Sequence, residues 1–128
     1  MASPGSYKTQ YLFRINKGCL DVSEHVQINK YLPESDRPVP FRNMIYIGDG
    51  ATDIPCMRVV KDRGGCTIAV YKPHTPGARA NVHQLVKEGR ANCIASAKYN
   101  EGSPLDKIVK TYIDHLQFYY AYKRLEET

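Results

Sequence analysis

The sequence has no long uninterrupted run of apolar residues and no closely spaced group of cysteines. A membrane-spanning helix needs about 20 consecutive apolar residues, and neither such a stretch nor a secretory signal pattern is present. The chain has four cysteines, Cys19, Cys56, Cys66 and Cys93, which lie far apart and lack the spacing of zinc ligands. These absences argue against a membrane protein and a disulfide scaffold. We therefore expect a cytoplasmic protein in which Cys66 and Cys93 act as small core residues.

Dense runs of basic residues are also absent. The net charge is +5 and the isoelectric point is about 9.0, which suits an anionic ligand such as a phosphate ester. The lysines and arginines are scattered along the chain, and no nucleic-acid-binding motif accompanies them. We therefore expect a solvated basic surface, and we do not expect nucleic acid as a partner.

The length and the order of the predicted elements indicate one α/β domain. A chain of 128 residues with 42% hydrophobic content is large enough for one real core. We expect residues 1–7 to form a flexible leader and residues 8–128 to form the domain. Periodicity and turn residues predict helices at 8–17, 23–31, 53–62, 78–88 and 103–122, loops at 33–40 and 72–77, and strands at 44–48, 66–71 and 92–96. Strands that alternate with helices are typical of a parallel sheet.

Two carboxylates follow the first predicted strand. Gly48 and Gly50 flank Asp49 and allow a tight turn at the carboxyl end of that strand, where open α/β sheets bind ligands. Asp49 and Asp53 can there hold a hard cation such as Mg²⁺, which prefers oxygen ligands and often acts beside a phosphate. The alternative is that Asp53, or Thr52 in its place, only caps the next helix and Asp49 only makes the turn.

Residues 44–57, MIYIGDGATDIPCM, resemble the fourth motif of the haloacid dehalogenase-like hydrolases. Lys8, at the start of a predicted helix upstream, resembles the third-motif lysine of the phosphoserine-phosphatase-like branch of that family. The downstream order of strands and helices is similar as well. The resemblance implies a partial Rossmann-like fold of three layers, with a short parallel sheet flanked by helices. It also implies Mg²⁺-dependent hydrolysis of phosphoric monoesters through an aspartyl-phosphate.

The resemblance assigns a role to each matching residue. Asp49 would bind Mg²⁺ directly. Asp53 would also bind the metal or would lie just behind its ligands and hold the lysine. Lys8 would offset the negative charge of the phosphoryl group and of the nucleophile. Thr52 departs from the family pattern, in which Asn often precedes the second acid, so a side-chain hydrogen bond there would be shortened or lost.

The larger departure is that no Asp-x-Asp occurs in these 128 residues, although the family takes its nucleophile from that motif. The chain thus resembles the carboxyl-terminal part of a catalytic domain, without the nucleophile strand and the cap. We expect it to be inactive alone and to act on a phosphorylated small molecule only when the missing half completes it.

The alternative is a non-enzymatic module that binds a partner or itself. Without a neighbouring nucleophile strand, one edge of Met44–Ile47 would be open, and an open strand edge pairs readily with another strand. We therefore expect a homo-oligomer, formed by pairing of this edge, by swapping of the predicted helix 8–17 or by packing of the tyrosine-rich terminal helix. The alternative is a compact monomer in which the amino-terminal segment folds back and covers the edge.

Overall fold

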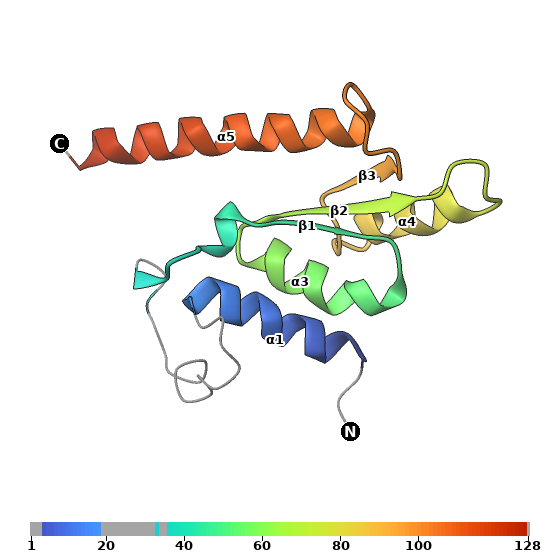
Figure 1. Cartoon of the computed structure of the whole chain (residues 1–128), viewed down its shortest axis with the longest axis horizontal. Coiled ribbons are helices and arrows are strands. Elements are labelled where there is room, and N and C mark those ends of the chain that lie inside the picture. Colours follow the sequence, from blue (N-terminus) through green and yellow to red (C-terminus); the bar gives the residue numbers. More distant parts are fainter. Residues whose placement is uncertain (1–3, 19–32, 34–35, 128) are drawn as a thin grey trace.

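The computed structural model of the chain describes residues 4–18, 33 and 36–127 (Figure 1). Its elements, in chain order, are α1 (Pro4–Lys17), η2 (Phe41–Asn43), β1 (Ile45–Gly48), η3 (Ala51–Asp53), α3 (Ile54–Asp62), β2 (Cys66–Tyr71), α4 (Ala78–Lys87), β3 (Cys93–Ser96) and α5 (Pro104–Glu126). The η elements are single turns of 3₁₀ helix. The predicted α/β class is confirmed: a short parallel sheet is flanked by helices, as in part of a Rossmann-like fold.

The three strands are parallel and lie in the order β1-β2-β3. Ile45 of β1 pairs with Cys66 of β2, and Ile68 of β2 pairs with Cys93 of β3. In this arrangement the carboxyl ends of the strands meet at one edge of the sheet. The segments that follow β1 and β2 therefore lie next to each other, and ligand-binding groups of parallel α/β proteins gather at this edge.

Alternating side chains of the central strand build two separate cores. Ile68 and Val70 pack with Ala95 and Leu105 on the face that α5 covers. Ala69 points to the opposite face, together with side chains of α3 and α4 such as Met57 and Val82. Figure 1 shows α5 on one side of the sheet and α3 and α4 on the other. The largely apolar sequence of β2 follows from its burial on both faces, and its one polar side chain, Thr67, is hydrogen-bonded to Asn92.

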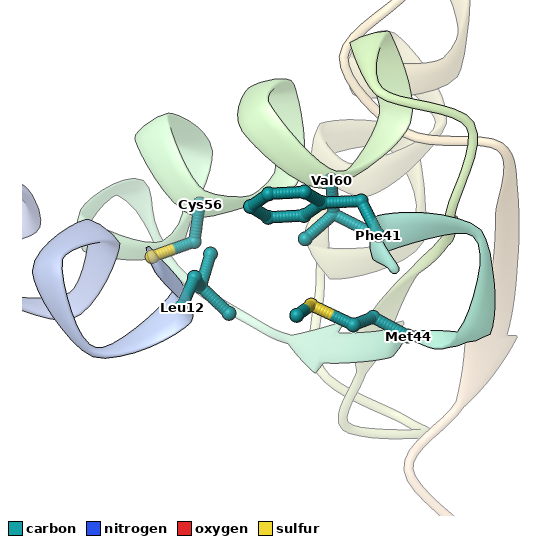
Figure 2. Close-up of a cluster of buried hydrophobic side chains, with 5 residues drawn as sticks. All are labelled: Leu12, Phe41, Met44, Cys56 and Val60. Carbon is teal, nitrogen blue, oxygen red and sulfur yellow. The ribbon is translucent and has the colours of Figure 1, made fainter. Parts of the chain in front are cut away.

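A third cluster docks α1 on this framework (Figure 2). Its buried members come from α1, η2, the residue before β1 and α3; they are Leu12, Phe41, Met44, Cys56 and Val60. Phe13 of α1 also meets the Phe41 ring edge-to-face, with 5.3 Å between the ring centroids. This packing fixes α1 against α3 and carries the start of α1 toward the carboxyl end of β1.

The strands lie within one residue of their predicted positions, whereas helix ends differ more. Helix α1 begins at Pro4, so the last residues of the predicted leader, 1–7, belong to this helix. Proline is tolerated there because the first helical N–H groups have no intrahelical acceptor. Helix α5 continues to Glu126, four residues beyond the predicted end. The predicted helix at 23–31 and Cys19 lie outside the described residues.

The short 3₁₀ turns η2 and η3 were not predicted. Of the helices among residues 4–18 and 36–127, none combines the length and the apolar character needed to cross a bilayer.

Candidate functional site

Lys8 and Asp53 meet at the carboxyl end of β1. The Lys8 ammonium lies 2.9 Å from Oδ1 of Asp53 and donates a second hydrogen bond, of 3.2 Å, to the hydroxyl of Thr52. Two predicted site residues that are 45 positions apart are therefore in direct contact. The Thr52 hydroxyl takes part in holding the lysine, so the departure from the family's Asn leaves a side-chain hydrogen bond in place.

The Asp53 carboxylate accepts four hydrogen bonds. Its Oδ1 accepts from Lys8 and from the hydroxyl of Tyr46, the latter at 2.7 Å. Its Oδ2 accepts from the backbone N–H groups of Asp49 and Gly50, at 3.0 and 3.2 Å. The side chain makes no capping hydrogen bond to α3. The bond from the Gly50 N–H closes a capping box at the start of η3, so Asp53 caps this turn. The further bonds from Lys8, Tyr46 and Asp49 contradict the interpretation that Asp53 is only a helix cap.

Gly48 leaves the space that this carboxylate occupies. A Cβ atom at residue 48 would lie 2.6 Å from the Asp53 Cγ, which is far inside van der Waals contact. A larger residue at the end of β1 would therefore push Asp53 away from its donors. The glycine predicted as a turn residue is thus required by close packing of the acid against the strand.

The donors around Asp53 keep it ionised. Burial opposes ionisation, but the hydrogen bonds from Tyr46, Lys8, Gly50 and Asp49 outweigh it, and the pKa of Asp53 is lowered. The hydrogen bond between Lys8 and Asp53 also raises the pKa of Lys8. Burial and the bond to Asp53 raise the pKa of Tyr46 far above its ordinary value. At neutral pH the cluster therefore holds an anionic Asp53, a cationic Lys8 and a neutral Tyr46.

Tyr46 is the residue that the sequence analysis missed. It stands in β1 and packs against both the α1 and the α4 side of the core, while its hydroxyl reaches Asp53. A tyrosine whose ring packs in the core needs a partner for its hydroxyl. Asp53, the acid at the start of the next helix, is seven residues away, so this requirement was a usable signal.

Asp49 lies on the exposed side of the same turn and lines a cavity of about 250 Å³. The cavity extends over the carboxyl end of β2 to the start of α4 and also contains Lys72, Thr75 and Asn81. Within the described part of the chain, Lys72 pairs with no carboxylate. One acid, one free cation and two neutral polar side chains thus converge at the ligand-binding edge of the sheet.

The two acids differ in what they offer a cation. The Asp49 carboxylate is exposed, whereas both oxygens of Asp53 already accept two hydrogen bonds each. No cluster of three or more His, Cys, Asp or Glu side chains with metal-binding geometry occurs among the described residues. Asp49 thus fits a hard cation as a single carboxylate ligand, and Asp53 fits the second predicted role, that of holding the lysine.

The comparisons with known proteins add one relative. An uncharacterized protein of Borreliella burgdorferi is 35% identical over 101 residues, which make up 77% of this chain and 32% of that protein. This chain therefore spans about a third of the length of that relative. No family model matches the chain. No solved structure matches it either.

Proposed function

We propose that this chain carries the phosphate-binding and metal-binding part of a haloacid dehalogenase-like, Mg²⁺-dependent phosphatase. The observation that carries the proposal is the 2.9 Å contact between Lys8 and Asp53 at the carboxyl end of β1, with Asp49 on the same turn. Phosphoryl transfer requires positive charge around the phosphoryl oxygens and a carboxylate-bound metal to orient them. The three side chains supply these two elements at one end of the sheet. A cytoplasmic location stays a prediction.

In this proposal Lys8 binds a phosphoryl oxygen. An ammonium has three N–H donors, and two of them are used by Asp53 and Thr52. The third is left for a ligand, and the side chain is 46% exposed to solvent. Because Asp53 is fixed by three other donors, it holds the charge of Lys8 in one position before the ligand arrives.

In this proposal Asp49 binds the cation directly and Asp53 supports the lysine. A bound Mg²⁺ would neutralise charge on the phosphoryl oxygens. The cavity beside Asp49, which Lys8 does not line, would receive the rest of the ester, with Lys72 offering a second positive charge there. The nucleophile of the family, an Asp of the Asp-x-Asp motif, has no counterpart in this sequence, and complete turnover therefore requires a carboxylate from another polypeptide segment.

Calorimetric titration of the purified chain with MgCl₂, in the presence of inorganic phosphate, tests the proposal. We expect weak binding, because one carboxylate and retained waters hold Mg²⁺ less well than a complete cage. Asp49→Asn removes the charged ligand and should weaken Mg²⁺ binding by about tenfold or more. The loss of a side chain that only hydrogen-bonds to a metal ligand already weakens metal binding by about tenfold.

Asp114→Asn is the matched control, because Asp114 is an exposed acid on α5, far along the chain from the β1 turn. It should bind Mg²⁺ as the original chain does. Equal binding by the original chain and by Asp49→Asn would refute the role of Asp49.

A second candidate function is a module that associates through β1. In the part of the chain that the structure describes, no strand pairs with β1 on the side away from β2. Ile47 on this strand is partly exposed, and α5 also carries exposed apolar side chains; they are Ile113, Phe118, Tyr122 and Leu125. An open edge and an apolar helix surface favour association.

Sedimentation velocity at micromolar concentration tests this second candidate. We expect a dimer or larger species whose population rises with concentration. Ile47→Lys, which places a charge on the edge strand, should shift the chain toward the monomer. Lys61→Gln on α3 changes a charge away from this edge and serves as the control. A monomer at all concentrations would exclude association through β1.

A further inference from the structure

A second and larger cavity lies at the other end of the sheet. It has a volume of about 470 Å³ and lies between α5 and the amino ends of β2 and β3. Because parallel strands begin at one edge and end at the opposite edge, this cavity is separated from the Lys8–Asp53 cluster by the length of the strands. Its volume falls in the range of pockets that hold small molecules, about 300–1,000 Å³.

Most of the wall of this cavity is apolar or neutral. Cys66 and Cys93 line it from the strands, and Ile108 and Tyr112 line it from α5. Burial raises the pKa of the Cys66 thiol to about 11, so this thiol is uncharged at neutral pH. The Tyr112 hydroxyl donates to the backbone oxygens of Arg42 and Gly64, which fixes the ring as a wall.

The polar side chains that line the cavity include one cation, Lys107, and one imidazole, His115, whose ring lies 5.6 Å from that of Tyr112. Lys107 and His115 stand two turns apart on the same side of α5. Asn92 uses its amide oxygen to accept from Thr67, which leaves its –NH₂ group as a donor. The Thr111 hydroxyl, between the two basic residues, donates to the backbone oxygen of Lys107.

The charge of Lys107 is not balanced by a neighbouring acid. The residues three and four positions away on α5 carry no carboxylate, and no acidic side chain lines the cavity. By contrast, Lys110 on the same helix lies 2.9 Å from Asp106. An apolar cavity with donors and an unpaired cation along one side is complementary to a molecule with an apolar body and an anionic group.

We propose that this cavity binds a small amphipathic anion, with its apolar chain against Cys66, Ile108 and Tyr112 and its carboxylate beside Lys107. The site does not depend on the proposed phosphatase function, since it shares no residue with the Lys8–Asp53 cluster or the cavity beside Asp49.

Decanoate and decanol are suitable probes, because they share an apolar chain and differ in the charge of the head group. Titration of the ¹⁵N-labelled chain, below the micelle concentration of decanoate, should shift the amide signals of β3 and the first half of α5. We expect decanoate to bind more tightly than decanol. Lys107→Gln should weaken decanoate binding about two- to fivefold, as expected for a solvent-exposed ion pair, and leave decanol binding unchanged.

Lys110→Gln is the matched control, because Lys110 is on the same helix but does not line the cavity. It should leave both affinities unchanged. Thr111→Leu adds apolar volume at the mouth and should weaken binding of both probes about fivefold or more.

Three results would overturn the proposal. The first is that neither probe shifts these signals. The second is that both probes bind with equal affinity and that Lys107→Gln changes neither affinity. The third is that a second copy of the chain occupies the cavity. In that case the chain would form a dimer that Thr111→Arg dissociates, and decanoate would not change the dimer.

Discussion

Asp53→Ala should lower the free energy of unfolding by about 2–4 kcal/mol. Asp53 is only 7% exposed, and the substitution leaves the Tyr46 hydroxyl and the backbone N–H groups of Asp49 and Gly50 without their acceptor. A buried donor without a partner costs about 1–3 kcal/mol, and partial access of water to the turn reduces the sum. The contact with Lys8 adds little to this figure, because the ammonium is largely in solvent. Urea denaturation followed by circular dichroism measures the change.

Two further variants separate the role of the charge from that of the shape. Asp53→Asn keeps one oxygen, which can still accept from the β1 turn, but its –NH₂ group then faces the Lys8 ammonium. We expect a loss of about 1–2 kcal/mol, because a hydrogen bond to a charged group is replaced by a contact between donors. Asp49→Asn is the control, since its exposed carboxylate should change stability by less than about 0.5 kcal/mol. Equal stability of all three variants would contradict the described network.

The pH dependence of stability should report the same carboxylate. Because the pKa of Asp53 is lowered in the folded state, its ionised form is favoured by folding. The contribution of Asp53 to the free energy of unfolding is complete above its pKa in the unfolded chain, about 4. It is lost as the pH falls toward the lower pKa of the folded state. The unfolding free energy of the original chain should therefore drop more steeply below about pH 4 than that of Asp53→Asn.

Phe41→Ala should have the largest effect on stability, about 3–5 kcal/mol. Phe41 is 0% exposed and joins α1 to α3 within the cluster of Figure 2, with Leu12 and Val60 among its neighbours. Truncation to alanine removes the edge-to-face contact with Phe13 and leaves a cavity that rigid neighbours fill only in part. Urea denaturation again measures the loss.

Phe118→Ala makes the same truncation on α5, where the ring is 78% exposed, and should change stability by less than about 0.5 kcal/mol. Phe41→Ala should also loosen the contact between Lys8 and Asp53, because this cluster packs α1 against α3 and so helps to hold Lys8 near the carboxyl end of β1. NMR detection of the Lys8 side chain would show its pKa returning toward the ordinary value. A stable Phe41→Ala chain with an unchanged Lys8 would mean that α1 is held by other contacts.

Local sequence patterns predicted the parallel sheet because each strand combines a short apolar run with a strong turn signal. Cys66–Tyr71, for example, lies between a Gly-Gly pair and a loop that contains proline, and β2 has these bounds. Helix ends were predicted less well, since a helix extends or stops according to small differences in capping. The start of α5 is an exception: the Ser103 hydroxyl accepts from the Asp106 N–H, and α5 begins at Pro104, one residue after the predicted start.

The resemblance and the residue spacing brought Lys8, Asp49 and Asp53 together as candidates, but they did not distinguish the two acids. That difference depends on burial and on donors supplied by other segments. Asp53 packs against Gly48 and accepts from Tyr46 and Lys8, whereas Asp49 faces the cavity that contains Lys72. The metal and the reaction are still proposals.

The sequence by itself determined the α/β class, the strand positions and the turn that carries two acids, because apolar periodicity and glycine requirements act over a few neighbouring residues. Only the tertiary structure decided which acid is buried, which tyrosine holds it and where two cavities form. These features require contacts between residues as far apart as Lys8 and Asp53, or Cys66 and Tyr112. Such contacts form when the helices pack against the sheet and exclude water. No local sequence pattern encodes that geometry.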